Sequence, residues 1–203
     1  MRGQIFGVAG SAPSEAGSTL LQTGETVSYG PGSDGATLAG VPASFLDNGD
    51  GTVTDNKTGL MWEKKTTAVG SGIDLANPND VDNYYTWHAG SGSTAPTGTA
   101  FTNFLDKLNG QAGPGTGFAG HYDWRLPTLE ELQGIVDPSA PGCGSGGPCI
   151  DAVFGPTQSD LYWSSSSYQN FPGFAWSVFF LDGSTGAGPK TLFTYVRAVR
   201  AGS

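Results

Sequence analysis

The sequence has few charged side chains, and basic ones are the scarcest. Charged residues make up 13% of the 203 positions, and 9 Lys and Arg stand against 18 Asp and Glu. The resulting net charge of -9 opposes binding to phosphate backbones and to anionic membrane surfaces. We therefore expect no nucleic-acid partner.

Long hydrophobic runs are also absent. No stretch of about 18 apolar residues occurs, so we expect no direct membrane insertion. The opening MRGQIFGVAGSAPSEAGS has one Arg and no continuous apolar run, which is unlike a signal peptide. We expect residues 1–20 to be a flexible leader or linker and residues 21–203 to form a single domain.

Cysteine and histidine are too rare for most metal sites. Cys143 and Cys149 lie in the glycine-rich stretch PGCGSGGPCID, which is compatible both with a disulfide and with two free thiols. With only 2 His in the chain, a zinc site is not expected. The Asp- and Asn-rich turn 48–51 fails as a calcium loop, because Leu46 and Lys57 would occupy its first and twelfth ligand positions. We expect no metal and no cofactor.

Catalytic motifs are missing as well. The run Ser164 to Ser167 lacks the G-x-S-x-G elbow of serine hydrolases, and the glycine-rich stretches lack the Lys-Ser/Thr of a P-loop. Carboxylates are scattered through turns, without a pair suited to acid and base catalysis. The sequence does not predict an enzyme.

Glycine and proline, by contrast, are abundant. The chain holds 33 Gly and 13 Pro, which indicates short elements joined by many turns. Asn48-Gly49-Asp50-Gly51 and Asn56-Lys57-Thr58-Gly59 predict two consecutive hairpin turns, with strands at 52–54 and 60–62.

A long polar excursion, residues 66–100, separates these hairpins from a first predicted helix. We expect the aromatic residues Tyr84, Tyr85 and Trp87 to anchor the excursion, and His88 to have a packing or surface role. The helix follows from apolar residues at i, i+3, i+4 and i+7, with Gly110 as its stop. They are Phe101, Phe104, Leu105 and Leu108.

A second helix is predicted in HYDWRLPTLEELQGIVD. Thr128 with Glu131 forms a capping box, and an apolar face follows at Leu129, Leu132, Ile135 and Val136. We expect Arg125 to form an ion pair that holds the start of this helix.

Strands are predicted for most of the last third. LYWSSSS, FAWSVFFL with a turn at Asp182-Gly183, and TYVRAVR have strand character, and the last would lock the C-terminus into a sheet. Two helices between strands give an α+β fold with small antiparallel sheets, long loops, and N- and C-terminal strands in the sheet.

Five ordered motifs together resemble a known family. FLDNGDGTVTDNKTGLMWEK, GTAFTNFLDKLN, HYDWRLPTLEELQGIVD, YWSSSSY and YVRAVR are similar to the C-terminal domain of the Legionella collagen-like adhesin. The resemblance implies a C-type-lectin-like fold, ligand binding, and a place on a cell surface, in the secreted fraction or on a virion. The acidic charge argues against sulfated polysaccharide as the ligand, and the calcium-dependent sugar triplet of true C-type lectins is missing.

The segment 162–200 also resembles the variable region of proteins that retroelements diversify. In that family, fixed residues form a frame and the residues between them contact the ligand. The resemblance implies a frame of Trp176, Val178, Phe180, Gly183 and Lys190, with Trp176, Val178 and Phe180 pointing inward. The implied ligand-binding positions are Phe171, Gly173, Phe174, Ser177, Phe179, Leu181, Asp182, Ser184, Gly186, Ala187, Gly188, Leu192, Phe193 and Thr194.

Codon chemistry agrees with this interpretation. An AAC codon altered only at its adenines still ends in C and never encodes Trp, Met, Lys, Glu or Gln. None of those residue types stands at the implied positions. The implied partner is a protein or another cell-surface ligand.

Two alternatives stay open. The strand at FAWSVFFL is also compatible with burial on both faces, which would leave no surface for a ligand. A fixed adhesin or carbohydrate-binding module of the same fold is compatible with the motifs, whereas an enzyme of the formylglycine-generating type would need reactive cysteines. The display hypothesis requires Phe179, Leu181 and Phe193 to be at least partly exposed and contiguous.

Overall fold

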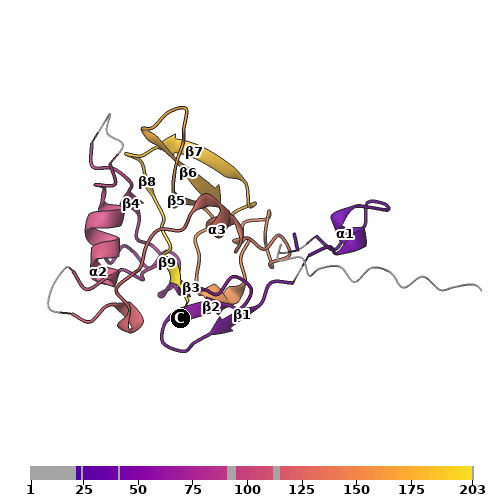
Figure 1. The fold of residues 1–203 in the computed structure, drawn as a ribbon, viewed down its shortest axis with the longest axis horizontal. Coiled ribbons are helices and arrows are strands. Elements are labelled where there is room, and N and C mark those ends of the chain that lie inside the picture. The colour runs from indigo at the N-terminus through magenta and orange to yellow at the C-terminus, as the bar shows by residue number, and fades with distance from the viewer. Residues whose placement is uncertain (1–21, 24, 41, 91–94, 112–114, 203) are drawn as a thin grey trace, which may run out of the picture.

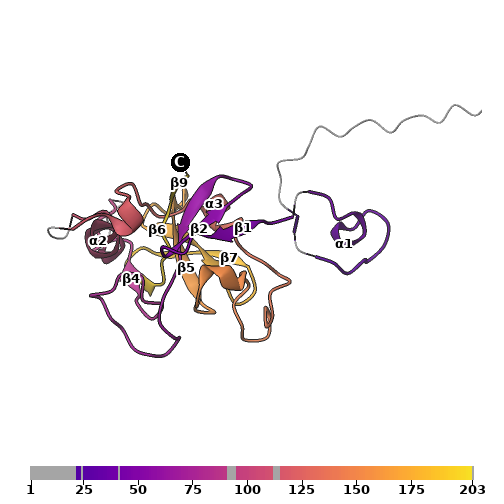
Figure 2. The same cartoon turned by 90° about the horizontal axis from the view of Figure 1, so that it is seen from below.

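The computed structural model describes residues 22–23, 25–40, 42–90, 95–111 and 115–202. The expected leader, residues 1–20, lies outside these. Figure 1 shows a main body built from strands and short helices, with the helical turn α1 (Asp34–Thr37) standing apart from it. The rotated view in Figure 2 also shows α1 apart from the main body.

Within the described residues the strands form three small antiparallel sheets. One has the order β1-β2-β3-β9, the second pairs β4 with β8, and the third has the order β5-β6-β7. The strands are β1 (Phe45–Asp47), β2 (Thr52–Asp55), β3 (Leu60–Glu63), β4 (Tyr85–Thr86), β5 (Leu161–Ser167), β6 (Phe174–Phe179), β7 (Thr185–Pro189), β8 (Phe193–Thr194) and β9 (Val199–Ala201). Together with the short helices they make an α+β arrangement, as predicted.

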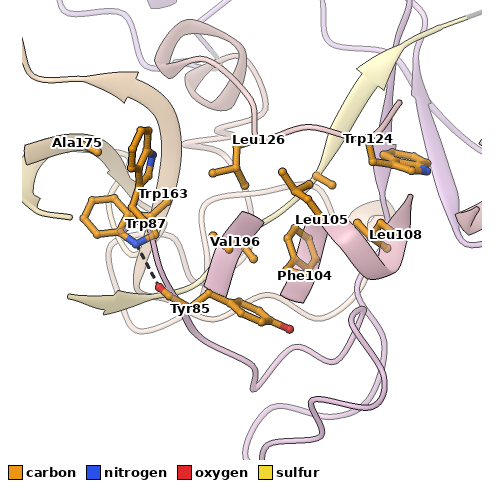
Figure 3. Close-up of a cluster of buried hydrophobic side chains, with 12 residues drawn as sticks. Tyr85, Trp87, Phe104, Leu105, Leu108, Trp124, Leu126, Trp163, Ala175 and Val196 are labelled. Carbon is orange, nitrogen blue, oxygen red and sulfur yellow. Dashed lines mark hydrogen bonds between the residues drawn. The ribbon is translucent and has the colours of Figure 1, made fainter. Parts of the chain in front are cut away.

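The first predicted helix divides into two parts. A π-helical segment, η1 (Ala100–Leu105), continues into α2 (Asp106–Leu108), and Gly110 follows with φ 67°. Phe104, Leu105 and Leu108 are buried in the cluster drawn in Figure 3, which also contains Trp87, Trp163 and Val196. The predicted apolar face is therefore correct, although the helix is wider than an α-helix over most of its length.

The second predicted helix, α3 (Leu129–Gln133), starts as its sequence indicates. Thr128 and Glu131 complete the capping box. Both terminal nitrogens of Arg125 lie 2.7 Å from the two carboxylate oxygens of Glu131, which confirms the ion pair expected at the helix start. Further 3₁₀ turns are η2 (Phe118–Gly120) and η3 (Ala152–Phe154).

The long excursion is fastened to β5 by two indoles. Trp87 Nε1 donates to the Ser164 carbonyl at 3.0 Å, and Trp163 Nε1 donates to the Tyr85 carbonyl at 3.3 Å. Tyr85 and Trp87 are buried, so they anchor the segment as predicted, whereas Tyr84 is 40% exposed.

The C-terminal strand is held by a buried charged cluster. Arg197, which is fully buried, donates to the carbonyls of Glu63 and Phe154 and to the Thr157 hydroxyl, at 2.8 to 2.9 Å. The Glu63 carboxylate lies 2.8 Å from Lys65 Nζ and accepts the Ala198 backbone N–H. This cluster joins β3, η3 and the segment before β9, and β9 pairs with β3.

Replacing Arg197 tests the importance of this cluster. Arg197→Leu leaves three buried acceptors without their donor, so we expect the free energy of unfolding to fall by about 3 kcal/mol or more in chemical denaturation. Lys57→Met, at the exposed β2–β3 turn, is the control and should change it by about 0.5 kcal/mol or less. Equal effects of the two variants would contradict the assignment.

The ion pair at the start of α3 predicts a specific dependence of stability on pH. The hydrogen bond from Arg125 lowers the pKa of Glu131 in the folded protein. A lowered folded pKa means that the stabilisation is present above the unfolded value of about 4.3 and is lost as the pH falls through the folded pKa. Denaturation series at stepped pH should show wild type losing its advantage over Glu131→Gln below about pH 4.

Glu130→Gln, at the exposed neighbouring carboxylate, is the matched control for removing one negative charge. If wild type kept its full advantage over Glu131→Gln down to the acid limit, the pair would not stabilise the helix start.

Candidate binding surface

The candidate surface is built on β5, β6 and β7. Within β6 the two faces differ: Ala175 packs in the cluster around Trp163, and Val178 packs in the cluster around Tyr162. Residues 175–178 of the strand therefore contribute to both clusters. Ala175 and Val178, on opposite faces of β6, are thus both buried, whereas Phe174, Trp176 and Phe179 are half-buried.

The expected frame is largely present. Val178 and Phe180 are fully buried, and Lys190 is 1% exposed. Gly183 has φ 77°, and a Cβ there would lie 2.8 Å from a methyl group of Val136. Trp176 departs from the expectation, because it is half-buried and packs edge-on against Tyr168 instead of entering the core.

Lys190 holds several segments together. Its ammonium group lies 3.8 Å from the centroid of the Trp87 ring and donates to the Ser167 hydroxyl at 2.7 Å. Its carbonyl accepts the N–H groups of Trp87 and His88, and its own N–H donates to Gly173. Burial lowers the pKa of this lysine, and the cation–π contact offsets part of the cost of burying its charge. His88 is itself buried, in agreement with a packing role.

The implied ligand-binding positions divide by exposure. The exposed ones are Phe171, Asp182, Ser184, Leu192 and Phe193. The half-buried ones are Gly173, Phe174, Phe179, Leu181, Gly186, Ala187 and Gly188. Phe179, Leu181 and Phe193 thus meet the requirement of partial exposure.

Ser177 and Thr194 are expected on the ligand-binding surface, but the structure shows that both are buried. Ser177 is 3% exposed, because its hydroxyl turns toward β7 and donates to the Gly186 carbonyl at 3.1 Å. Thr194 is 7% exposed, because β8 pairs it with the buried Tyr85. Neither side chain is open to a ligand.

The side chains expected to form one contiguous surface belong to two different sheets. Phe179 lies opposite Leu161 in the β5-β6-β7 sheet, whereas Phe193 lies opposite Thr86 in the β4-β8 sheet. Phe193, 63% exposed, packs edge-on against Tyr84 at 5.5 Å. Tyr84 also contacts Tyr195, so an aromatic patch forms around β8. No pattern in the sequence distinguishes the exposed Tyr84 from its buried neighbours Tyr85 and Trp87.

A second aromatic group lies at the turn between β5 and β6. The Tyr168 and Phe171 rings stack at 5.8 Å, and Phe171 also contacts Phe174. Phe171 is 60% exposed. The implied positions in this turn therefore form one local cluster with Tyr168 and Trp176, which were not among them.

The turn between β6 and β7 is tied to the disulfide loop. Cys143 and Cys149 form a disulfide, which settles the choice left open by the sequence. The Leu181 carbonyl accepts the Gly144 N–H, and the Phe180 carbonyl accepts that of Cys149. Hydrogen bonds from the Ser184 hydroxyl and N–H lower the pKa of Asp182. This loop supports the turn that carries Leu181 and Asp182.

Two cavities of the described residues lie away from the aromatic side chains of this surface. One of about 870 Å³ is lined by Pro141, Pro148 and Pro156 among others, and one of about 640 Å³ lies between Phe45 and Ile135 and reaches only Gly183 of the 171–194 segment. Exposed aromatic side chains are the usual anchors of protein interfaces. The 171–194 segment is therefore the stronger candidate for a binding surface.

Metal and membrane chemistry find no support in the described part of the chain. No cluster of three or more His, Cys, Asp or Glu side chains there has the arrangement of a metal site. No helix in that part is long and apolar enough to cross a bilayer.

The candidate surface thus presents partly exposed apolar side chains over a buried frame. The family model of the Lcl C-terminal domain, the C-terminal domain of the Legionella collagen-like protein, matches residues 51–200, and this chain belongs to that family. No curated protein gives a significant match.

A pair of glycines tests how the β6–β7 turn is built. Gly183→Ala forces a side chain into a positive φ and against Val136, so we expect a loss of at least about 1 kcal/mol of stability. At Gly186 an added Cβ meets nothing within 4 Å, so Gly186→Ala should change stability by about 0.5 kcal/mol or less. Thermal unfolding of both variants makes the comparison, and equal melting temperatures would contradict the role of Gly183.

Proposed function

We propose that this domain is a ligand-binding display module with a C-type-lectin-like fold, in which a retroelement diversifies the segment 162–200. The observation that carries the proposal is the separation of two residue sets in this segment. Val178, Phe180 and Lys190 are buried, while Phe171, Leu192 and Phe193 are 50% to 63% exposed. Substitution of the second set need not disturb the first.

The fold assignment is supported by the position of the two ends of the domain. β9 pairs with β3 in the sheet that also contains β1 and β2, so early and late strands share one sheet. Short helices and long loops fill the sequence between them, as the family resemblance implies.

The ligand class follows from the chemistry of the exposed set. Lys190 is the one basic residue between 162 and 194, and it is buried. The exposed set is aromatic, aliphatic or hydroxylic, apart from the Asp182 carboxylate. Such a surface suits a protein or another surface ligand of low negative charge, and it does not suit sulfated polymers or nucleic acid.

Binding is favoured over catalysis. Cys143 and Cys149, the only cysteines of the chain, are joined in the disulfide, so they offer no thiol for formylglycine-type chemistry. A domain that displays a binding surface belongs on a cell surface, in the secreted fraction or on a virion.

Alanine substitution tests the separation of display from folding. Phe179→Ala with Phe193→Ala removes two display side chains, and we expect the melting temperature to stay near that of wild type. Phe180→Ala, the matched change on the neighbouring buried ring, should cost about 3–5 kcal/mol. A comparable loss of stability in the double variant would assign Phe179 and Phe193 to the core.

The binding role needs a separate measurement. Randomising Phe171, Asp182, Ser184, Leu192 and Phe193 in a displayed library, with selection against hen lysozyme, should give folded binders whose affinity is lost on reversion to the parental residues. Recovery of only unfolded or non-specific clones would contradict a display surface.

The DNA beside the gene distinguishes diversification from a fixed adhesin. A near-copy of the 3′ end with Asn codons at the implied positions, next to a reverse-transcriptase gene, is the expected result. A lone gene would favour the fixed adhesin or carbohydrate-binding module.

A further inference from the structure

A serine and a lysine from different parts of the chain meet at the end of β5. Lys190 Nζ donates to Ser167 Oγ at 2.7 Å, although the two residues lie 23 positions apart. Strand pairing brings them together, because Ser167 lies opposite Ala175 and Ala175 lies opposite Gly188. The sequence around Ser167 lacks the G-x-S-x-G elbow of serine hydrolases, so no local motif predicts this pair.

The two members of the pair differ in their access to solvent. Lys190 is 1% exposed, whereas Ser167 is exposed. Ser167 lines a cavity of about 370 Å³, which lies within the size range of small-molecule sites. A small molecule can therefore reach the hydroxyl while the amine is shielded from water.

The surroundings of Lys190 change its protonation. Burial disfavours the charged form of a lysine, and it lowers the pKa of Lys190. The centroid of the Trp87 ring, 3.8 Å from Nζ, acts in the opposite direction, because an aromatic face attracts a cation. The lowered pKa raises the fraction of neutral amine above that of an ordinary surface lysine. A neutral amine at hydrogen-bond distance from a hydroxyl is able to accept its proton, as a general base does.

The neighbouring Ser166 supplies an internal reference. It lines the same cavity, but its Oγ accepts the Leu129 N–H at 3.0 Å. A backbone N–H donates a hydrogen bond and cannot act as a base. The two adjacent serines thus face one cavity, and the bond to a lysine distinguishes Ser167 from Ser166.

We propose that Ser167 is an acyl-accepting nucleophile and that Lys190 is its general base. Ser167 Oγ bonds to the carbonyl carbon of an ester as the hydroxyl proton passes to the Lys190 amine. The bond from that carbon to the leaving oxygen then breaks, and this oxygen takes the proton from Lys190 and departs as an alcohol. The protein keeps one acyl group as an ester on Ser167, so the site attaches a ligand covalently.

The lining of the cavity indicates the class of ester. Glu130 adds negative charge, which opposes an anionic acyl group. Leu129, Tyr168 and Trp176 supply apolar surface, which suits a short neutral acyl chain. The inference goes beyond the display function and does not depend on diversification, because neither Ser167 nor Lys190 is one of the implied variable positions.

The test uses 4-nitrophenyl acetate on the full chain, with peptide mass mapping to locate the acetyl groups. We expect about tenfold or more acetyl ester on Ser167 than on Ser166. Neutral hydroxylamine should remove it, because hydroxylamine cleaves esters and leaves the amides formed on surface lysines. Ser167→Ala should lose this adduct, whereas Ser139→Ala, at an exposed serine outside the cavity, should keep it. Equal acetylation of Ser166 and Ser167 would overturn the proposal.

Lys190→Arg separates the base from the positive charge. Arginine keeps the cation and its contact with an aromatic ring, but it is not deprotonated in proteins. The rate of acetylation at Ser167 should fall by about a hundredfold, with the melting temperature measured to check folding. An unchanged rate in a folded Lys190→Arg variant would refute the role of Lys190.

The pH profile of wild type covers the case in which Lys190→Arg does not fold. The rate at Ser167 should rise with pH and level off below the ordinary lysine value of about 10.4, because the pKa of Lys190 is lowered. The other titratable groups near the pair are Glu130 and Tyr168 in the lining and His88, whose N–H donates to the Lys190 carbonyl. A rate that rises in proportion to hydroxide without a plateau would contradict a lysine base.

Discussion

The guanidinium of Arg197 is buried where several distant segments of the chain meet. It bonds to the carbonyls of Glu63 and Phe154 and to the hydroxyl of Thr157, which come from separate parts of the chain. Burial lowers the pKa of this arginine, and the nearby Glu63 carboxylate opposes that shift. Because so little of this glycine-rich chain is regular structure, a buried side chain whose two terminal nitrogens bond to three groups from distant segments is an important source of stability, although its Nε has no hydrogen-bond partner among the described residues.

Two buried basic residues support the segment that carries the candidate surface. Arg197 anchors the segment that leads into the C-terminal strand β9. Lys190 connects the segment after β7 to Trp87 and Ser167. The hydrogen bond from Lys190 to Ser167 thus joins the two ends of the chain that carries β6 and β7.

The sequence predicted features that depend on local patterns and failed where distant packing decides. The capping box of Thr128, the ion pair of Arg125 and the strands β2, β3, β5 and β6 follow from neighbouring residues. The strand β7 (Thr185–Pro189) has no alternating pattern, because its small residues are selected by contact with β6. The local sequence predicts that the hydroxylic residues Ser177 and Thr194 lie on the surface. Their burial depends on the strands that pair beside them, and the local sequence does not specify that pairing. Trp176 shares the period-two spacing of Val178, which predicts burial in the core. It is only half-buried, because the core ends before its position.

The segment 162–200 is proposed to contain buried residues that folding requires and exposed residues that it does not require. Measuring protease resistance for every single substitution in this segment tests that claim directly. Phe171, Leu192 and Phe193 should tolerate most residue types, with changes of about 0.5 kcal/mol or less. Tyr162, Trp163, Val178, Phe180 and Arg197 should tolerate almost none. A uniform loss of resistance across both sets would contradict the account, because it would mean that no part of the segment is free to change.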